Sequence, residues 1–377
     1  MKVIQVSKFY PPIRGGIESV AWELTEGLNR AGVRADVLCA NQAPRTVRER
    51  APLGYEIVRA ASIGRLMSTS VALPMVGLLR TLSRGCDLIH IHMPDPMAAA
   101  ALWAARPQAR VVVHWHSDVV RQRVAMWAYE PLQRWVLQRA DAIIATSQAY
   151  ADSSRPLKPW LPKVEVVPIG ISDNRGSSSS ERAAAIRRRL GARRIVFALG
   201  RMTYYKGFDV LIDAARSLPD DCSVVIGGDG ELCDYYRQLV KRKGLESKVH
   251  LTGHIPDHEL ASYFEACDVF CLPSTLRAEA YGVAMVEAMA MGKPVVASDI
   301  AGSGVPWVNQ HGRTGLNVPV HDSGALADAI GVLLRDADRC RILGEGARER
   351  YQGEFSARQM TERTLQMYRR LVPAGAA

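Results

Sequence analysis

Residues 194–217 read RIVFALGRMTYYKGFDVLIDAARS, and this stretch decides the fold class. The apolar run 194–199 predicts a buried strand, Gly200 interrupts it, and the apolar spacing from Phe208 to Ser217 predicts a helix. The same strand–loop–helix pattern recurs on both sides of this stretch. Strands separated by helices indicate parallel sheets covered by helices on both faces, which is an α/β fold.

The pattern occurs in two blocks. Strands are expected in the first block at 3–7, 34–40, 56–59, 88–92, 110–114, 142–146 and 164–168, and in the second at 194–199, 223–227, 249–252, 269–272, 294–298 and 315–318. Residues 172–180 between the blocks are polar and serine-rich, as is typical of a linker. We expect a Rossmann-like domain over residues 1–172, a linker over 173–181 and a second Rossmann-like domain over 182–355, with a ligand cleft between them.

The charge of the chain is uneven. Its 377 residues carry a net charge of +10, and residues 1–170 hold 21 Lys and Arg against 13 Asp and Glu. The absence of a nucleic-acid-binding motif argues against a nucleic-acid partner. The basic half therefore predicts contact with an anionic lipid surface or a lipid-diphosphate acceptor, or is only a solubilising surface. The sequence has no long apolar run for a membrane span or signal peptide, and its seven cysteines lack metal spacing, which favours reduced thiols in the cytoplasm.

Two loops follow strands and precede helices. Arg201 and Lys206 share the loop after the strand 194–199, where two cations at a helix start can hold a diphosphate. Gly15 and Gly16 occupy the equivalent loop of the first block and let the backbone approach a ligand closely. A solvated basic loop and an ordinary turn are the simpler alternatives.

Two glutamates, Glu279 and Glu287, stand eight residues apart in what we expect to be a helix over 279–291. Eight helical residues rise about 12 Å, similar to the distance from a donor sugar to the ribose of its nucleotide. Carboxylates accept hydrogen bonds from hydroxyl pairs, and the N–H groups between them can face a phosphate. The alternative is two surface glutamates on an amphipathic helix.

Histidines cluster at two strand ends of the first block. His116 and Asp118 follow the strand 110–114, and His90 and His92 share one face of the strand 88–92. A histidine at a strand end can contact a sugar hydroxyl or stabilise charge, although a buried structural histidine is the alternative. No acidic or cysteine partner falls at ligand spacing, so we expect no metal.

Together these features resemble glycosyltransferase family 4, the retaining enzymes of the GT-B fold. The resemblance covers nearly the whole chain and rests on three motifs: PPxxGGxE over residues 11–18, the Gly200-Arg201 and Lys206-Gly207 pairs, and Glu279-x7-Glu287 running into AMAMGKPVVA over 288–297. It implies two Rossmann-like α/β/α domains facing across a cleft. It also implies that the C-terminal helix, within residues 356–377, crosses back onto the first domain.

The resemblance implies roles for individual residues. His116, Glu279, Arg201 and Lys206 would be catalytic. Donor contacts would come from Gly15, Gly16, Arg201, Lys206, Glu279, Ala280, Tyr281, Gly282, Val283, Ala284 and Glu287, and we add His254 as a candidate for the base pocket. His92, Asp118 and Arg121 are candidates for the acceptor side. Such enzymes need no metal or cofactor.

Further stretches, including 87–96, 116–122 and 307–312, are similar to bacterial enzymes that build O-antigen or exopolysaccharide chains. This similarity favours a hexosyltransferase that moves mannose from GDP-mannose to a lipid-linked saccharide, at the cytoplasmic face of the inner membrane. A UDP-sugar-dependent transferase is the alternative within the family. An epimerase or a non-catalytic nucleotide-sugar-binding protein is the alternative outside it.

Overall fold

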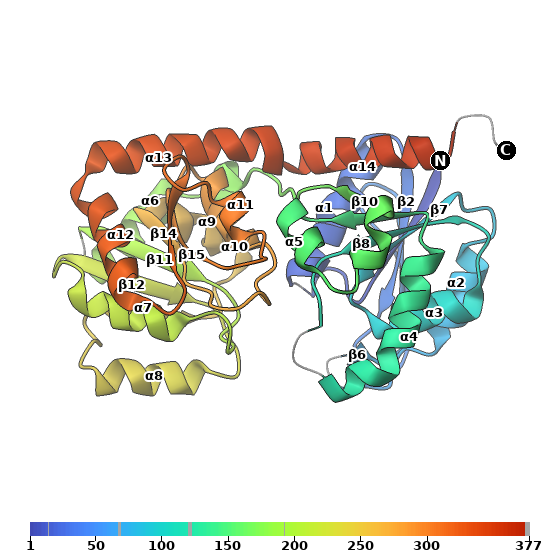
Figure 1. The fold of residues 1–377 in the computed structure, drawn as a ribbon, viewed down its shortest axis with the longest axis horizontal. Coiled ribbons are helices and arrows are strands. Elements are labelled where there is room, and N and C mark those ends of the chain that lie inside the picture. The colour runs from blue at the N-terminus through green and yellow to red at the C-terminus, as the bar shows by residue number, and fades with distance from the viewer. Residues whose placement is uncertain (14, 67–68, 120–122, 192, 374–377) are drawn as a thin grey trace. The chain divides into compact units, whose positions relative to one another are not determined.

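The computed structural model describes residues 1–13, 15–66, 69–119, 123–191 and 193–373 (Figure 1). The chain divides into two compact units. Unit 1 comprises Met1–Ser172 and Ala357–Ala377, and unit 2 comprises Asp173–Ser356. Each unit has its own sheet and its own set of helices.

Unit 1 is built on an eight-stranded sheet. Its strand order is β10-β9-β8-β7-β1-β2-β4-β3, and the pairs are parallel except β3 with β4. The strands are β1 (Lys2–Ser7), β2 (Arg34–Ala40), β3 (Val47–Arg50), β4 (Glu56–Ala60), β7 (Leu88–Met93), β8 (Arg110–Trp115), β9 (Ala142–Ala145) and β10 (Val164–Val166). A separate two-stranded sheet pairs β5 (Arg65–Leu66) with β6 (Thr69–Ser70) in antiparallel orientation. The seven strands expected from the sequence are present, and the exposed edge strand β3 is additional, because its polar residues VRER give no burial pattern.

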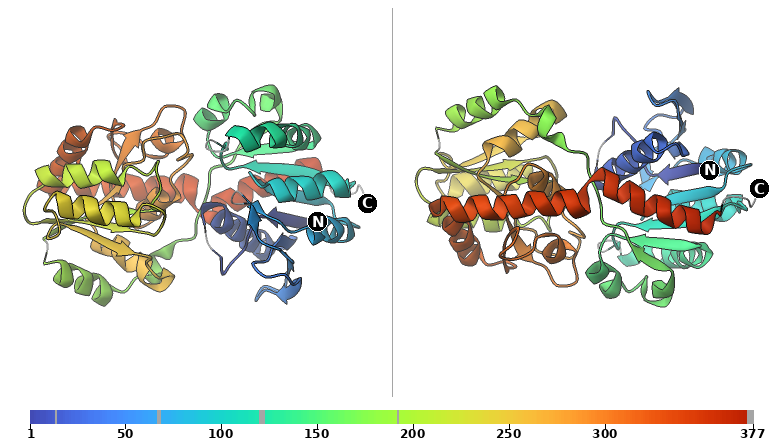
Figure 2. Two further views of the ribbon diagram at one scale, coloured as in Figure 1. Left: turned by 90° about the horizontal axis from the view of Figure 1, so that it is seen from below. Right: turned by 90° about the horizontal axis from the view of Figure 1, so that it is seen from above.

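The helices of unit 1 are α1 (Gly16–Arg30), α2 (Pro74–Leu82), α3 (Pro96–Ala105), α4 (Arg123–Arg139), α5 (Gln148–Ser153) and α14 (Ala357–Leu371). The helices α1 and α14 lie side by side (Figure 2). Their approach is close at Gly27, where an added Cβ would lie 2.1 Å from Oγ1 of Thr361. A glycine at this position therefore allows the C-terminal helix to pack against the first helix.

Unit 2 is built on a six-stranded parallel sheet in the order β13-β12-β11-β14-β15-β16. Its strands are β11 (Arg194–Leu199), β12 (Cys222–Gly227), β13 (Val249–Gly253), β14 (Val269–Leu272), β15 (Val295–Asp299) and β16 (Gly315–Pro319). Its helices are α6 (Ser180–Leu190), α7 (Phe208–Ala214), α8 (Cys233–Arg242), α9 (Asp257–Ala266), α10 (Val283–Ala290), α11 (Val305–Val308), α12 (Ser323–Arg335) and α13 (Ala337–Arg350). Most residues of the central strands β11 and β14 are apolar and buried, as expected for parallel strands covered on both faces.

The serine-rich segment at the start of unit 2 is ordered by helix caps. Residues Asn174–Ser177 form a 3-10 helix, and the side chain of Asp173 accepts a hydrogen bond from the N–H of Arg175. The hydroxyl of Ser179 caps α6. Serine and aspartate favour linkers and helix caps alike, so composition alone does not separate the two.

The strand order of each sheet defines where ligands bind. In unit 1 the chain passes from β1 to β2 in one direction and from β7 to β8, β9 and β10 in the other, so the order reverses between β1 and β7. In unit 2 it reverses between β11 and β14 in the same way. Ligands of open α/β sheets bind beyond the carboxyl ends of the strands at such a switch point.

Candidate active site

The switch point of unit 2 holds an ion pair between the loops that follow β11 and β14. Nζ of Lys206 lies 2.5 Å from Oε2 of Glu279, and the two side chains are only 12% and 10% exposed. The hydroxyl of Ser274 donates a hydrogen bond of 2.9 Å to the same carboxylate oxygen. Two residues that the sequence suggests for the site are therefore in direct contact.

The two loops are held together by backbone contacts. The N–H of Thr275 donates to the carbonyl oxygen of Tyr205 at 2.8 Å. Gly207 has a φ of +64°, and a Cβ there would lie 2.0 Å from the carbonyl oxygen of Pro273. Only glycine combines this conformation with so close an approach, so Gly207 fixes where Lys206 points.

The pair keeps Lys206 charged. Burial disfavours its ammonium group, but the charge and hydrogen bond of Glu279 outweigh burial and raise the pKa of Lys206. The ammonium also lies 5.5 Å from the ring centroid of Tyr205. A charged lysine held at a switch point is suited to bind a diphosphate.

Arg201 lies in the same loop but is exposed. Its guanidinium is 3.6 Å from Oε2 of Glu231, and 71% of its side chain is exposed. The hydroxyl of Thr203 donates to the other oxygen of Glu231 at 2.8 Å. Sequence reasoning missed Glu231, although the run Gly227-Gly228-Asp229-Gly230 before it, at the end of β12, was a signal for a loop at the sheet edge.

The helix expected over 279–291 is shorter than predicted. The helix α10 begins at Val283 with Gly282 as its N-cap, so Glu279 lies in the loop before it and not on the helix. The Ser303 hydroxyl donates to the Glu279 carbonyl at 2.5 Å, and the Gly304 N–H donates to the Ala280 carbonyl at 2.9 Å. These bonds hold residues 279–282 outside the helix, so the 12 Å helical rise does not measure the separation of Glu279 from Glu287.

The remaining donor-side residues occupy the same edge of unit 2. Ala280 and Tyr281 are buried, and Glu287 is partly buried on α10. Val283 and Ala284 form the first turn of α10, which no side chain caps in the part of the chain that the structure describes. His254 is exposed just after β13, at the end of a different strand.

In unit 1 the candidate His116 follows the end of β8, close to the switch point. Its Nε2 lies 2.9 Å from Nδ1 of His92, and Nε2 of His92 lies 3.0 Å from Oε1 of Gln5. Burial and the neighbouring imidazoles lower the pKa of both histidines well below the usual value, so both rings are neutral. His92 is fully buried behind His116, with both ring nitrogens hydrogen-bonded within the unit.

The other candidates of unit 1 differ in their surroundings. Gly15 is the N-cap of α1, and Gly15 and Gly16 are both exposed. Oδ1 of Asp118 accepts hydrogen bonds from the indole of Trp115 and the hydroxyl of Ser154, at 2.9 and 2.7 Å. Arg121 lies outside the described residues.

Three of the buried imidazoles are near enough to consider as metal ligands. Ring nitrogens of His90, His92 and His114 lie within 4.8 Å of one another. The group contains no carboxylate or thiolate to offset a divalent charge, and each ring is hydrogen-bonded to another side chain. Hydrogen bonding accounts for the cluster better than a metal does.

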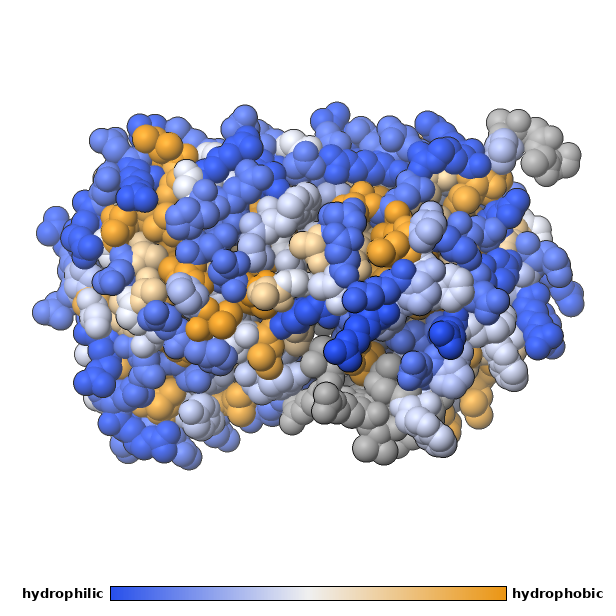
Figure 3. All heavy atoms as spheres, in the orientation of Figure 1, coloured by the Kyte–Doolittle hydropathy of each residue, from blue (hydrophilic) through white to orange (hydrophobic). Residues whose placement is uncertain are grey.

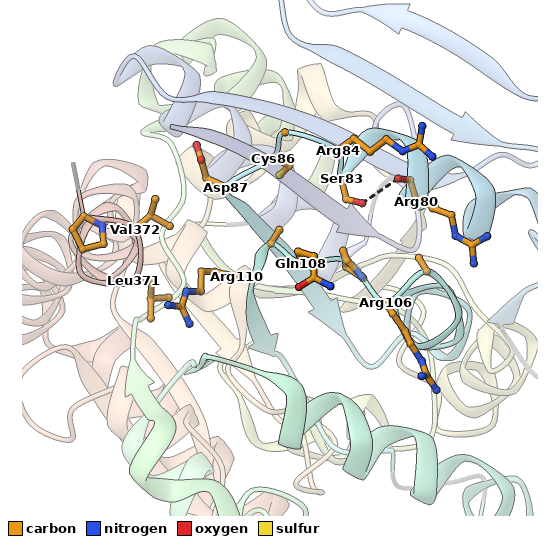
Figure 4. A pocket seen from close by; sticks show the side chains of 15 residues that line it. Arg80, Ser83, Arg84, Cys86, Asp87, Arg106, Gln108, Arg110, Leu371 and Val372 are labelled. Atoms are coloured by element: carbon orange, nitrogen blue, oxygen red, sulfur yellow. Dashed lines mark hydrogen bonds between the residues drawn. The ribbon is translucent and has the colours of Figure 1, made fainter. Parts of the chain in front are cut away.

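A hollow of about 720 Å³ lies at the opposite edge of the unit 1 sheet, where β7 and β8 begin. Figure 4 shows the arginine side chains that line it, Arg80, Arg84, Arg106 and Arg110. All four are exposed. Because it adjoins the amino ends of the strands, this hollow is separate from the switch point of unit 1.

Solved structures show which fold the chain has. Sucrose-phosphate synthase from Thermosynechococcus elongatus has a TM-score of 0.81 at 23% identity, covering 99% of this chain and 100% of that one. Anabaena HepE, solved in complex with UDP and glucose, has a TM-score of 0.78 at 22% identity, covering 97% and 99%. The fold is that of the GT-B glycosyltransferases, as the sequence predicted.

The chain itself belongs to the glycosyl transferases group 1 family. Residues 181–350 match that family, and residues 15–170 match the glycosyl transferase 4-like domain. The O-antigen chain mannosyltransferase C of Escherichia coli is 33% identical over 99% of both chains. The D-rhamnosyltransferase WbpZ of Pseudomonas aeruginosa is 32% identical over 95% of this chain and 93% of its own.

A third relative is the GDP-mannose-dependent alpha-(1-6)-phosphatidylinositol monomannoside mannosyltransferase of Mycobacterium tuberculosis, 30% identical over 92% of this chain and 93% of its own. The chain is thus a glycosyltransferase, and its relatives act in the synthesis of surface polysaccharides and glycolipids. Among the described residues, none of the helices has the length and apolar character needed to cross a membrane.

Proposed function

We propose that this glycosyltransferase moves a hexose, best assigned as mannose from GDP-mannose, to a lipid-linked saccharide acceptor, with retention of anomeric configuration and without a metal. The observation that carries the proposal is the buried contact of Lys206 with Glu279 at the switch point of unit 2. Support for mannose comes from the names of two relatives that are each at least 30% identical over more than nine-tenths of this chain.

Unit 2 holds the donor in this proposal. Lys206 and Arg201 bind the diphosphate, and the uncapped first turn of α10 adds the N–H groups of Val283 and Ala284. Glu279 accepts hydrogen bonds from sugar hydroxyls, and Glu287 does the same for the ribose. When a donor replaces the Lys206–Glu279 contact, the ammonium of Lys206 pairs with phosphate oxygens and the carboxylate of Glu279 accepts hydrogen bonds from sugar hydroxyls.

The leaving diphosphate is the chemical reason for this arrangement. When the sugar–phosphate bond breaks, negative charge develops on the phosphate oxygen, and two cations and a helix N-terminus stabilise it without a metal ion. In the same step the acceptor hydroxyl forms the new glycosidic bond and gives its proton to that oxygen. The sugar is thereby transferred while the nucleoside diphosphate leaves protonated.

The test is a donor panel with matched variants. Transfer from GDP-mannose, UDP-glucose and UDP-GlcNAc to a lipid-linked oligosaccharide is measured by product mass, and binding of GDP, UDP and ADP by calorimetry. Transfer from GDP-mannose is expected, with strong loss in Lys206→Ala and Glu279→Ala and none in Arg341→Ala. Arg341 is an exposed control residue on α13, 2.9 Å from Glu345.

A UDP-sugar is the second candidate donor. It is favoured by the fold neighbour HepE, which was solved with UDP and glucose. Selective binding of UDP in the same panel would replace mannose by a UDP-linked sugar and keep the reaction class. Equal rates in wild type and both site variants would overturn the site assignment.

The proposal also includes peripheral contact with an anionic membrane on the cytoplasmic side. The four exposed arginines of the hollow in unit 1 support it, and so does Trp103, which is 48% exposed and 6.0 Å from the guanidinium of Arg106. On the face shown in Figure 3 the apolar side chains form small patches between hydrophilic ones. Each arginine near an anionic surface contributes about 1 kcal/mol.

Vesicle sedimentation tests this contact. Binding to vesicles with phosphatidylglycerol but not to pure phosphatidylcholine is expected, and it should weaken in Arg84→Ala/Arg106→Ala. Arg358→Ala removes an exposed arginine of α14 and serves as the control. Equal binding by all three proteins would rule out the arginine-lined hollow as the contact surface.

A further inference from the structure

A chain of hydrogen bonds connects His116 to the C-terminal helix through the core of unit 1. It runs from Nε2 of His116 to Nδ1 of His92 at 2.9 Å, and from Nε2 of His92 to Oε1 of Gln5 at 3.0 Å. The Nε2 group of Gln5 then donates to the hydroxyl of Tyr368, on α14, at 3.3 Å. Gln5, His92 and Tyr368 are fully buried.

The series of hydrogen bonds continues from Tyr368 to a second pair of histidines. The hydroxyl of Tyr368 lies 2.5 Å from Nδ1 of His90, and Nε2 of His90 lies 3.2 Å from Nδ1 of His114. It ends at Nε2 of His114, which is buried and has no hydrogen-bond partner among the described residues.

Each hydrogen bond in this series has a single proton to share. Burial and neighbouring imidazoles lower the pKa of His90, His92 and His116, and burial lowers that of His114 to about 3, so each ring carries one N–H. Burial also raises the pKa of Tyr368, so its hydroxyl keeps its proton. Each bond therefore has one donor, and the direction of one bond determines the next.

The direction follows from the amide of Gln5. Oε1 of Gln5 can only accept a hydrogen bond, so His92 donates from its Nε2–H. Nδ1 of His92 is therefore unprotonated. The Nε2–H of His116 then donates to that nitrogen, which leaves Nδ1 of His116 without a proton. In the other branch, Tyr368 accepts from Gln5 and donates to His90.

We propose that Gln5 and Tyr368 are positioning residues that fix the tautomer of His116 through His92, so that Nδ1 of His116 accepts a hydrogen bond from a hydroxyl of the transferred sugar. The role of His116 at the sugar rests on the function proposed above. The tautomer itself rests only on the hydrogen bonds of unit 1.

The buried end of the hydrogen-bond chain distinguishes the two possible directions. The stated direction places an N–H on Nε2 of His114, which has no acceptor among the described residues. A buried donor without an acceptor is costly. The opposite amide orientation would remove this cost but would reverse every bond and place a proton on Nδ1 of His116.

Nuclear magnetic resonance of the full chain tests the tautomer directly. Long-range ¹H–¹⁵N correlation spectra of protein labelled at histidine nitrogen distinguish a protonated from a bare ring nitrogen, and loss of signals in His116→Asn assigns that residue. We expect Nε2 of His116 to be protonated and its Nδ1 to be unprotonated. A protonated Nδ1, or shifts typical of a metal-bound imidazole together with metal in elemental analysis, would overturn the proposal.

Variants of Gln5 then test the coupling. Gln5→Leu removes the acceptor for His92, so the His116 signals should show both tautomers. Gln5→Glu keeps an acceptor at this position and should restore the single tautomer. An unchanged His116 spectrum in Gln5→Leu would show that the hydrogen bonds through His92 do not determine the tautomer of His116.

Steady-state kinetics connect the tautomer to transfer. Gln5→Leu is expected to lower kcat about tenfold with little change in KM for the donor, and Gln5→Glu to recover most of that loss, because partners that orient an active-site imidazole typically affect rate by such factors. Tyr368→Phe should give a smaller loss in the same direction. It also covers the case in which Gln5→Leu does not fold.

The matched control is Thr364→Val, one helical turn before Tyr368 on α14. The hydroxyl of Thr364 is buried and has no hydrogen-bond partner among the described residues, so its removal should leave the spectrum and kcat unchanged. Loss of kcat in Thr364→Val equal to that in Tyr368→Phe would mean that only helix packing matters. If no donor supports transfer while His116 shows the expected tautomer, the donor assignment fails and the coupling stands.

Discussion

The two units place their candidate residues at the same point of the same kind of sheet but use opposite chemistry. In unit 2 the loops after β11 and β14 bring together a charged lysine and a carboxylate. In unit 1 the corresponding edge holds neutral imidazoles in hydrogen bonds with an amide and a phenol. The fold thus fixes where a ligand binds, and the loop residues determine whether the site suits a diphosphate or uncharged hydroxyls.

The largest expected effect is the loss of charge in unit 2. Lys206→Ala should reduce kcat about 10²–10³-fold, because in the proposed mechanism it removes the buried cation that would stabilise the leaving diphosphate. Glu279→Gln keeps the shape of the side chain and one acceptor oxygen, so its kcat should fall less than that of Glu279→Ala. Rates from single-turnover experiments at saturating donor are the measurement.

A stability control separates catalysis from folding for this pair. Lys206→Ala leaves the carboxylate of Glu279 buried without its cation, so thermal unfolding of unit 2 is measured in parallel. A variant that stays folded and still transfers at the wild-type rate would contradict the contrast between the charged and neutral sites.

The second effect concerns the packing of α14 onto unit 1, which brings Tyr368 to the histidines. Gly27→Ala should destabilise unit 1 by about 1–3 kcal/mol, because its Cβ would collide with Oγ1 of Thr361. Gly77→Ala is the matched control, since that helical glycine has open space around it. Chemical denaturation of both variants is the measurement, and equal stability would contradict the tight α1–α14 contact.

The third effect is a pH dependence that belongs to unit 1. Burial lowers the pKa of His114 from its usual value to about 3. The unfolded chain binds a proton at His114 below about pH 6.5 and the folded chain does not, so this group alone lowers the free energy of unfolding by about 1.4 kcal/mol per pH unit on acidification between these values. The other buried histidines, whose pKa values are also lowered, add to the slope. His114→Gln should reduce that slope.

A control without an ionisable side chain sharpens this prediction. Thr364→Val removes a buried hydroxyl of unit 1 that does not titrate in this range, so it should leave the slope unchanged. The denaturation midpoint of unit 1 between pH 7.5 and 5.5 is the measurement. A His114→Gln slope equal to that of wild type would show that the imidazole is not held neutral.

The sequence predicted the sheets well because parallel buried strands leave apolar runs that can be recognised one by one, as at β11 and β14. It also predicted that Arg201 and Lys206 lie in the loop after β11. It did not predict that α10 begins at Val283, because backbone bonds from Ser303 and Gly304, distant in sequence, hold Glu279 and Ala280 out of the helix.

The hydrogen-bond chain of unit 1 was not predictable for a related reason. Gln5 and Tyr368 are 363 positions apart, and an amide in the first strand and a tyrosine in the last helix carry no local signal of their contact. Such a contact depends on the packing of α14, which no periodicity in the sequence specifies.

The smallest expected effect compares the two cations of unit 2. Arg201 is 71% exposed and its partner Glu231 is 3.6 Å away, so solvent and Glu231 already compensate its charge. Arg201→Ala should lower kcat only about threefold and raise KM for the donor by a similar factor, far below the effect of Lys206→Ala. Arg237→Ala, which removes an exposed arginine 2.6 Å from Asp234, is the control for loss of surface charge. If Arg201→Ala instead lowered kcat as much as Lys206→Ala, closure over the donor would have to bury the guanidinium, and the exposed and buried cations would then act as one clamp.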